Sequence, residues 1–296
     1  MNWLSESYVK GLLRSKNNLL VTLLALFCFC SCGDRACDMF IPEGYELAWH
    51  DEFDGDALDT SCWTAETGGH GWGNAELQYY TDREQNVDVR DGKLVITAMK
   101  EDYEGSAFTS ARIKTLGKVG FRYGYVVASI KLPDTSDGLW PAFWMMGDDI
   151  EQLGWPDCGE IDVLEMGHRE GIDSGRQDRF LNGACHWGNP HHQYSARNVV
   201  YPYAIQDGQF HTFTCIWDES GVSMYIDRET HPEAEPYFAM QFEDYGNNEF
   251  HKDNFILLNL AIGGNFPAIW HADGITALTE GSRSMEVDYV RVFRRK

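Results

Sequence analysis

The sequence predicts an all-β protein, a sandwich or jelly roll assembled from many short strands. From about residue 41 onward, short runs of alternating apolar and polar residues end at Gly, Asp or Pro, which is typical of strands and turns. The sequence has no long helical period, internal repeat or low-complexity linker in this region. One all-β domain is ordinary for a chain of 296 residues, so we expect a single domain over residues 41–296.

The first half of this region contains a hairpin and a long strand. Residues 87–98 are interpreted as a hairpin around Asp91-Gly92, a dipeptide favoured in tight turns. Residues 121–132 are expected to form a long strand with one apolar face. That face consists of Val126, Ala128, Ile130 and Leu132.

The second half continues the strand pattern. Residues 210–217 and 222–227 are expected to pair across a turn at residues 219–221. Residues 255–262 are nearly all apolar, as in a central strand of a sandwich, and residues 285–293 form the last expected strand.

The most informative segment is GEIDVLE at residues 159–165, where three carboxylates fall within six residues. Branched apolar residues separate them, as in a strand, although Glu and Asp are depleted in strands. On a regular strand Glu160 and Asp162 share a face and Glu165 lies on the other. A β-bulge at residues 163–164 would return Glu165 to the side of its partners and leave the apolar residues in the core.

Acids grouped on one surface suit glycoside hydrolysis with retention, which needs two carboxyl groups about 5–5.5 Å apart. The long side chains of Glu160 and Glu165 can close most of the gap along the strand. Asp162 between them can influence the protonation of a neighbour, because adjacent like charges cannot all ionise freely. The alternative is a solvated acidic edge strand, since structural carboxylates are commoner than catalytic ones. The aromatic residues nearby favour the catalytic interpretation.

The overall charge restricts the partners. Lys and Arg total 24 against 46 Asp and Glu, a formal net charge of −22. Nucleic acid and anionic membrane surfaces need basic patches, so neither is an expected partner, and highly sulfated polysaccharides are disfavoured on the same ground. The chain has 10 Trp, 14 Tyr and 16 Phe, on whose faces sugar rings can stack. A neutral polysaccharide is therefore the expected substrate.

Residues 1–31 have the layout of an export signal, in which basic residues precede an apolar run at residues 19–29 that is short for a bilayer span. The Ser31-Cys32 pair that follows resembles a bacterial lipobox. It predicts lipidation of Cys32, a short tether over residues 32–40, and an exported protein anchored to the outer membrane on its periplasmic or outer face. An ordinary cleaved signal peptide is the alternative, because the two preceding residues are unusual for a lipobox.

Cysteine usage indicates no metal site. An odd number of cysteines follows Cys32, so they cannot all pair, and no C-x-x-C spacing occurs. These residues are Cys37, Cys62, Cys158, Cys185 and Cys215. A bridge between Cys158 and Cys185 stays open, but buried free thiols are the simpler expectation.

Several further motifs follow one another along the chain. They are WHDEF at residues 49–53, WGNAELQYYT at 72–81, TSAR at 109–112, YG at 123–124, GLWPAFW at 138–144, WP at 155–156, HWG at 186–188, NLAIGGN at 259–265 and VDYVRV at 287–292. Together with the acid segment, they resemble the laminarinase-type enzymes of glycoside hydrolase family 16 over residues 49–293.

The resemblance implies a concanavalin-like β-jelly roll of two curved antiparallel sheets with a substrate cleft on the concave face. It further implies a monomeric endo-glycosidase that cleaves β-1,3-glucan (laminarin) or mixed-linkage β-1,3/1,4-glucan by double displacement, without a catalytic cofactor. In this scheme Glu160 attacks, Glu165 serves as acid and base, and Asp162 tunes the pair.

Two alternatives stay open. Enzymes on the same fold that cleave red-algal galactans (agar, porphyran or carrageenan) share the bulged spacing, although the acidic charge and the motif at residues 72–81 disfavour them. A non-catalytic β-glucan-binding lectin is the second alternative, but such proteins lose the catalytic acids, and all three are present here.

The resemblance also suggests residues that contact sugar. They are Asn74, Arg112, Trp140, Trp144, Trp155 and His186. Trp140 and Trp144 are four residues apart and therefore share one face of a strand. Either residue alone is as often a core residue as a cleft residue. His186 can bond to the acid/base or the leaving sugar, and a satisfied core histidine is the alternative. The His191-His192 pair lacks further ligands at useful spacing and is interpreted as a loop.

A structural calcium is implied by the same resemblance. Glu52, Gly92 and Asp288 lie in segments that meet on the convex side in this family, and a carboxylate with carbonyl oxygens suits a hard cation. Without calcium, Asp288 would be a surface acid.

Overall fold

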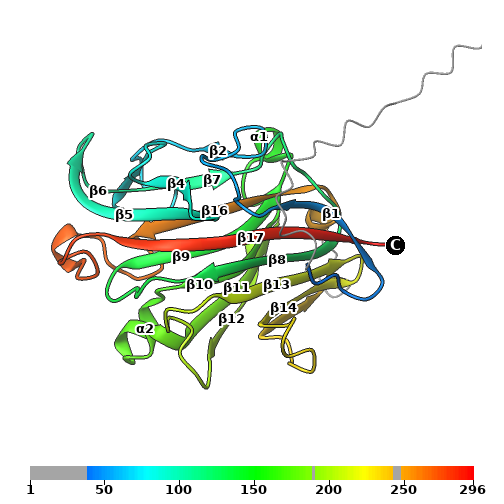
Figure 1. Ribbon diagram of the computed structural model, residues 1–296. Coiled ribbons are helices and arrows are strands. Elements are labelled where there is room, and N and C mark those ends of the chain that lie inside the picture. Colours follow the sequence, from blue (N-terminus) through cyan, green and yellow to red (C-terminus); the bar gives the residue numbers. More distant parts are fainter. Residues whose placement is uncertain (1–38, 189–190, 243–247) are drawn as a thin grey trace, which may run out of the picture.

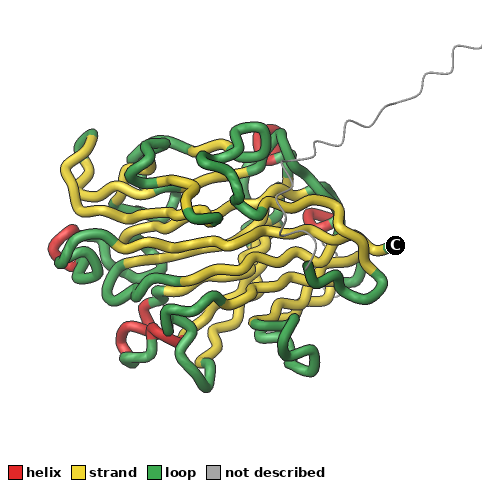
Figure 2. Tube along the Cα trace, in the orientation of Figure 1, coloured by secondary structure: helices red, strands yellow, loops and turns green. Residues whose placement is uncertain are grey.

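The computed structural model describes residues 39–188, 191–242 and 248–296, which form two large β-sheets packed face to face (Figure 1). Strands are the main regular secondary structure, and the short helical segments lie at the periphery of the molecule (Figure 2). The predicted all-β jelly roll is therefore confirmed. The expected signal peptide, Cys32 and Cys37 lie outside the described residues. Within the described part, no helix combines the length and apolar character needed to cross a membrane.

The larger sheet has ten strands. They are β1 (Tyr45–Asp51), β3 (Gln78–Tyr80), β4 (Val87–Arg90), β5 (Lys93–Tyr103), β6 (Ser106–Ser110), β8 (Gly124–Lys131), β13 (His211–Asp218), β14 (Gly221–Ile226), β15 (Phe238–Gln241) and β17 (Arg283–Arg295). Their order is β15-β14-β13-β8-β17-β5-β6-β3, with β1 paired to β17 and β4 to β5. These pairs are antiparallel except β3 with β6.

The smaller sheet has seven strands and carries the cleft described below. They are β2 (Thr64–Ala65), β7 (Arg112–Lys114), β9 (Leu139–Gly147), β10 (Glu160–Met166), β11 (Phe180–Trp187), β12 (Gln193–Val200) and β16 (Asn254–Ile262). Their order is β12-β11-β10-β9-β16-β7-β2. The helical segments are α1 (Ile150–Leu153), α2 (Arg169–Asp173), η2 (Gln177–Arg179), η3 (Asn248–Phe250) and η4 (Ala272–Gly274).

The predicted hairpin at residues 87–98 is confirmed. Arg90 of β4 pairs with Lys93 of β5, and Asp91 and Gly92 between them have φ angles of 51° and 68°. Two consecutive positive φ angles are what a tight hairpin turn of this kind requires, which explains the Asp-Gly dipeptide. The predicted strand at residues 121–132 is also present, but β8 begins only at Gly124.

The hydrophobic core lies between the sheets and determines which residues face the cleft. The predicted apolar face of β8 is part of this core. Strand β16 is buried along its whole length because it is covered on both faces. Ile256 and Leu258 point into the main core, whereas Phe255 and Leu257 pack with Met146 in a second cluster on the opposite face. The apolar run predicted at residues 255–262 is therefore a central strand of the seven-stranded sheet.

The cysteines within the described residues are buried free thiols, as expected. They are Cys62, Cys158, Cys185 and Cys215. Cys158 packs in the second cluster, whereas Cys185 points into the main core from β11. The two thiols thus belong to opposite faces of the seven-stranded sheet, which explains why they do not form the disulfide that the sequence left open.

Candidate active site

Strand β10 contains the predicted β-bulge. Against β11, Asp162 pairs with Ala184 and Glu165 with Asn182, so three steps along β10 match two steps along β11. The pairing with β9 shifts between Asp162 and Leu164 as well. The extra residue compensates for the odd spacing between the acids, and Glu165 lies on the same face as its partners.

The apolar residues of β10 hold this geometry in place. Ile161, Val163 and Leu164 are fully buried in the main core behind the sheet. Moving the strand by one residue would expose them and bury the carboxylates, which is unfavourable on both faces. Core packing therefore directs Glu160 and Glu165 into the cleft.

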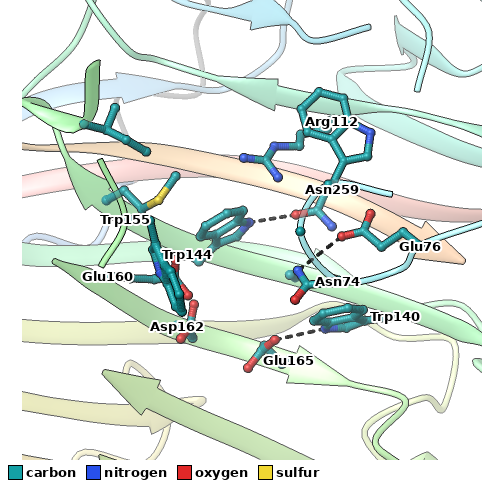
Figure 3. Close-up of a pocket in the computed structure, with 15 residues that line it drawn as sticks. Asn74, Glu76, Arg112, Trp140, Trp144, Trp155, Glu160, Asp162, Glu165 and Asn259 are labelled. Atoms are coloured by element: carbon teal, nitrogen blue, oxygen red, sulfur yellow. Dashed lines mark hydrogen bonds between the residues drawn. The ribbon is translucent and has the colours of Figure 1, made fainter. Parts of the chain in front are cut away.

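The three acids form the floor of a cleft on the outer face of the seven-stranded sheet (Figure 3). One cavity of about 300 Å³ lies on one side of the acids and continues into a second of about 790 Å³ that contains the same acids. The first is lined by Trp72, Gly73, Asn74, Glu76, Arg112, Trp140, Ala142, Trp144, Met146, Ile150, Trp155, Glu160, Asp162, Glu165 and Asn259. The mixture of indoles, amides and acids suits a sugar chain, which presents apolar ring faces and hydroxyl groups.

All six residues expected to contact sugar lie in this cleft. Asn74, Trp140 and Trp155 line both cavities, Arg112 and Trp144 line the first, and His186 lines the second. Trp140 and Trp144 lie on the cleft face of β9, as their spacing indicated, and Trp155 is half-exposed in the loop before β10.

Glu165 is held by an indole. The Trp140 Nε1–H donates a hydrogen bond of 3.0 Å to Glu165 Oε1. The Trp140 ring in turn stacks on Phe266, with centroids 4.8 Å apart and planes 9° apart. One carboxyl oxygen of Glu165 is thus oriented by a side chain that is itself fixed by packing.

Asp162 and His186 lie together on neighbouring strands. His186 Nε2 is 3.3 Å from Asp162 Oδ2, and His186 Nδ1 is 2.9 Å from His192 Nε2. The Trp155 ring packs over His192 with centroids 4.6 Å apart. The expectation that His186 faces the acid cluster rather than the core agrees with this placement, and its contact is with the middle acid.

The pKa values of all three carboxyl groups are raised. Burial raises the pKa of Glu160 to about 8, with a further contribution from the charge of Asp162, while His186 and Arg112 act in the opposite direction. Burial also raises the pKa of Asp162. The pKa of Glu165 lies well above its usual range, because burial and the charges of Asp162 and Glu160 all favour the protonated form. Glu165 is therefore the group most inclined to keep a proton.

Arg112 is stacked between two indoles. Its guanidinium carbon lies 4.9 Å from the ring centre of Trp72 and 4.7 Å from that of Trp144. Arg112 Nε also forms an ion pair of 2.6 Å with Glu66. These contacts hold its position at the wall of the cleft before any ligand binds.

Sequence reasoning missed a polar network next to Trp144. The Trp144 Nε1–H donates to Asn259 Oδ1 at 2.7 Å, and Asn259 Nδ2 donates to the Tyr80 hydroxyl at 3.2 Å. The Tyr80 hydroxyl donates to Glu76 Oε2 at 3.1 Å, and Asn74 Nδ2 to Glu76 Oε1 at 3.4 Å. Asn259 is the polar residue within the apolar run at 255–262, which was an available signal.

Residues of the second cavity were also missed. His191 and His192 do lie in a loop, as expected, but His192 reaches the cleft and contacts His186. Phe266 and Tyr194 line the same cavity. Phe266 directly follows the NLAIGGN motif, which was an available signal, whereas no motif marked Tyr194 of β12.

The three residues of the predicted calcium site lie in or next to strands of the ten-stranded sheet: Asp288 is in β17, Glu52 directly follows β1 and Gly92 directly precedes β5. Asp51, one residue before Glu52, pairs with β17 two residues after Asp288. Leu94, two residues after Gly92, pairs with β17 one residue before Asp288. Strand register therefore brings Glu52, Gly92 and Asp288 to one region of the ten-stranded sheet, whereas the cleft lies on the seven-stranded sheet.

A two-sheet jelly roll with three carboxyl groups in an indole-lined cleft defines a protein of the glycoside hydrolase class. The model of glycosyl hydrolases family 16 matches residues 74–252, and the chain belongs to this family.

Individual proteins show the same similarity. The chain is 35% identical over 277 residues to glucan endo-1,3-beta-glucosidase A1 of Niallia circulans, which covers 85% of this chain but only 38% of that protein. A family 16 protein of the mixed-linkage glucan locus of Bacteroides ovatus, solved with a G4G4G3G product, aligns with a TM-score of 0.72 at 36% identity over 82% of this chain and 99% of that one. The laminarinase catalytic domain of Thermotoga maritima also gives a TM-score of 0.72, at 33% identity over 86% of this chain and 100% of that one.

Proposed function

We propose that this protein is a retaining endo-β-glucanase acting on β-1,3-glucan such as laminarin, or on mixed-linkage β-1,3/1,4-glucan. The observation that carries the proposal is the bulged strand β10, which presents Glu160, Asp162 and Glu165 to one cleft. Similar proteins are described as acting on β-1,3-glucan and as binding a mixed-linkage product, which supports both substrates.

The reaction proceeds in two displacements. In the first, the Glu160 carboxylate attacks the anomeric carbon while the glycosidic C–O bond breaks, and Glu165 transfers its proton to the departing oxygen. In the second, the Glu165 carboxylate takes a proton from water, the water oxygen attacks the anomeric carbon, and Glu160 leaves as a carboxylate. Both displacements invert the configuration, so the product retains it, and no cofactor is required.

The surroundings of the two glutamates support these roles. Glu165 has the strongly raised pKa expected of a general acid, and the Trp140 N–H orients it. Burial raises the pKa of Glu160 as well, to about 8, and His186, Arg112 and a hydrogen bond from Trp155 oppose that rise. These groups favour the anion that a nucleophile needs.

Asp162→Asn should reduce kcat by less than loss of either glutamate, because it removes a neighbouring charge and not a bond-making group. The negative charge of Asp162 raises the pKa of both Glu160 and Glu165. Removing it lowers both values, so both limbs of the pH profile should move to lower pH. Measurement of kcat and kcat/KM against pH will check this, and an unshifted profile contradicts the tuning role.

The function is tested by incubating the purified protein with laminarin, lichenan, agarose, porphyran and carrageenan and measuring new reducing ends. Release from laminarin or lichenan is the expected result. Release only from a galactan favours the galactan-cleaving alternative. Binding to laminarin without reducing ends identifies a lectin.

A structural calcium is also proposed, on the ten-stranded sheet. Glu52 is buried and both its carboxyl oxygens accept hydrogen bonds of 2.8 Å from Arg291, so its backbone carbonyl is the ligand that we propose for a cation. That carbonyl, the carbonyl of Gly92 and the carboxylate of Asp288 would supply oxygen donors only, which suits calcium.

Chelation should lower the melting temperature, because an ion that binds only the folded state stabilises it by mass action. Activity at moderate temperature should change little, since the site belongs to the sheet opposite the cleft. Thermal unfolding with excess calcium and after exhaustive chelation measures the effect, and identical curves remove calcium from the proposal.

We further propose that the exported protein is anchored to the outer membrane through lipidated Cys32, which the Ser31-Cys32 pair supports. Wild-type protein expressed in a Gram-negative host should label with a fatty-acid analogue and sediment with membranes. Cys32→Ala should abolish labelling and either release the protein or leave its signal uncleaved. A wild type that is soluble and unlabelled contradicts the anchor.

A further inference from the structure

Two of the three acids and a neighbouring histidine also form a cluster of metal-ligating atoms, a capacity that the hydrolysis scheme does not use. One ligand atom each from Glu160, Asp162 and His186 lies within 4.8 Å of the other two. Zinc holds nitrogen and oxygen ligands at about 2.0–2.2 Å, which separates neighbouring ligands by roughly 3–3.5 Å. Modest side-chain rotations would therefore bring all three atoms onto one cation.

The burial of Asp162 provides a second observation. The residue is only 4% exposed, and its Oδ2 atom has no hydrogen-bond partner among the described residues. This atom points at His186 Nε2, 3.3 Å away, within the same cluster. Buried acceptors almost always have a partner, and either a proton on His186 Nε2 or a cation bound between the two atoms would supply one here.

His186 is also prepared in the manner of a metal ligand. Its Nδ1 lies 2.9 Å from His192 Nε2, and the two rings stack with planes 19° apart. When Nδ1–H donates to His192, the Nε2 lone pair faces Asp162 and Glu160. A ligating histidine usually donates its other ring N–H to an acceptor, which fixes the tautomer and orients the ring.

We propose that this cleft binds one divalent transition cation of the zinc type, with Glu160, Asp162 and His186 as ligands and His192 supporting His186. The imidazole ligand favours Zn²⁺ over Ca²⁺ and Mg²⁺, which prefer oxygen donors only. The bound ion occupies the acids and thereby blocks glucan hydrolysis in competition with substrate. This last clause rests on the proposed function, whereas the binding site does not.

Binding is tested by titrating Zn²⁺ into the metal-free full-length chain by calorimetry, with saturating Ca²⁺ present to fill any oxygen-donor site. One Zn²⁺ per chain is expected. His186→Ala and Asp162→Asn should each weaken Zn²⁺ binding at least about 10-fold, and His192→Ala about 10- to 100-fold. His191→Ala is the matched control, because this neighbouring histidine is outside the cluster, and its affinity should equal that of the wild type.

The same site can be observed directly with Co²⁺ as a spectroscopic probe. The Co²⁺-loaded protein should show visible absorption bands but no thiolate-to-metal charge-transfer band. The visible bands should disappear in His186→Ala but not in His191→Ala. Circular dichroism of each variant separates ligand loss from misfolding. Equal Zn²⁺ affinity in the wild type and in folded His186→Ala overturns the site, as does a cobalt spectrum dominated by thiolate.

Kinetics then test the blocking role. Zn²⁺ should raise the apparent KM of the wild type for laminarin and leave its kcat unchanged. In His192→Ala, the same Zn²⁺ concentration should raise the apparent KM less, compared with the KM of that variant without Zn²⁺. A fall in kcat at constant KM overturns the competitive role. If Zn²⁺ binds as described and no polysaccharide is cleaved, the proposed function fails and the metal site stands.

Discussion

Glu160→Ala should abolish the hydrolysis of laminarin, reducing kcat by about 10⁴-fold or more, because the group that attacks the anomeric carbon is lost. Added azide should restore turnover of an activated glucoside, since a small anion fits the space left by the carboxylate. The azide attacks from the side of the missing nucleophile, so the product should be an α-glucosyl azide. NMR of the product determines its configuration.

The control for this experiment is Glu84→Ala, which removes an exposed acid that is not part of the cleft lining. It should retain wild-type activity and should not respond to azide. NMR of the wild-type reaction supplies a separate check. If its first product has inverted configuration, Glu160 is not a nucleophile, and the close approach of the two glutamates required for retention is wrong as well.

Glu165→Ala should behave differently. Cleavage of laminarin should fall by about 10²- to 10⁴-fold, the usual contribution of general acid–base catalysis. On a glucoside whose leaving group needs no proton, the first displacement should survive, because Glu160 is intact. The glycosyl-enzyme should then accumulate, since no base activates water. Azide should react with this intermediate and give the β-configured product.

Burst kinetics with a dinitrophenyl glucoside and mass spectrometry of the intact protein measure that intermediate. A covalent adduct should appear in Glu165→Ala and be absent from Glu160→Ala. Trp140→Phe is a useful companion variant, because it removes only the N–H that donates to Glu165 Oε1 and keeps a ring against Phe266. If Glu165→Ala cleaves activated and natural substrates with equal loss, Glu165 is not the acid/base.

Several features of this protein could be predicted from local patterns alone. The spacing in GEIDVLE is incompatible with a regular strand that keeps all its acids on one face, so it predicted the bulge that β10 contains. The Asp91-Gly92 dipeptide predicted the turn with two positive φ angles. These features depend on neighbouring residues, because pleat, bulge and turn conformation are determined over a few positions.

Contacts between distant segments could not be predicted in this way. Asn259 faces the Trp144 indole because β16 pairs with β9 in one particular register, and no pattern within either strand specifies it. The hydrogen bond between His186 and His192 likewise joins the end of β11 to the residue before β12, and no local pattern specifies it.

The sequence by itself determined the fold class, the strand that carries the acids and the face to which they point. These depend on the alternation of apolar and polar residues, which decides what is buried. Only the tertiary structure decided which groups meet those acids: the Trp140 indole on Glu165 and the imidazole of His186 beside Asp162. Such contacts depend on the packing of whole sheets and on the course of the chain between strands. They join residues that are far apart in the sequence and share no local pattern.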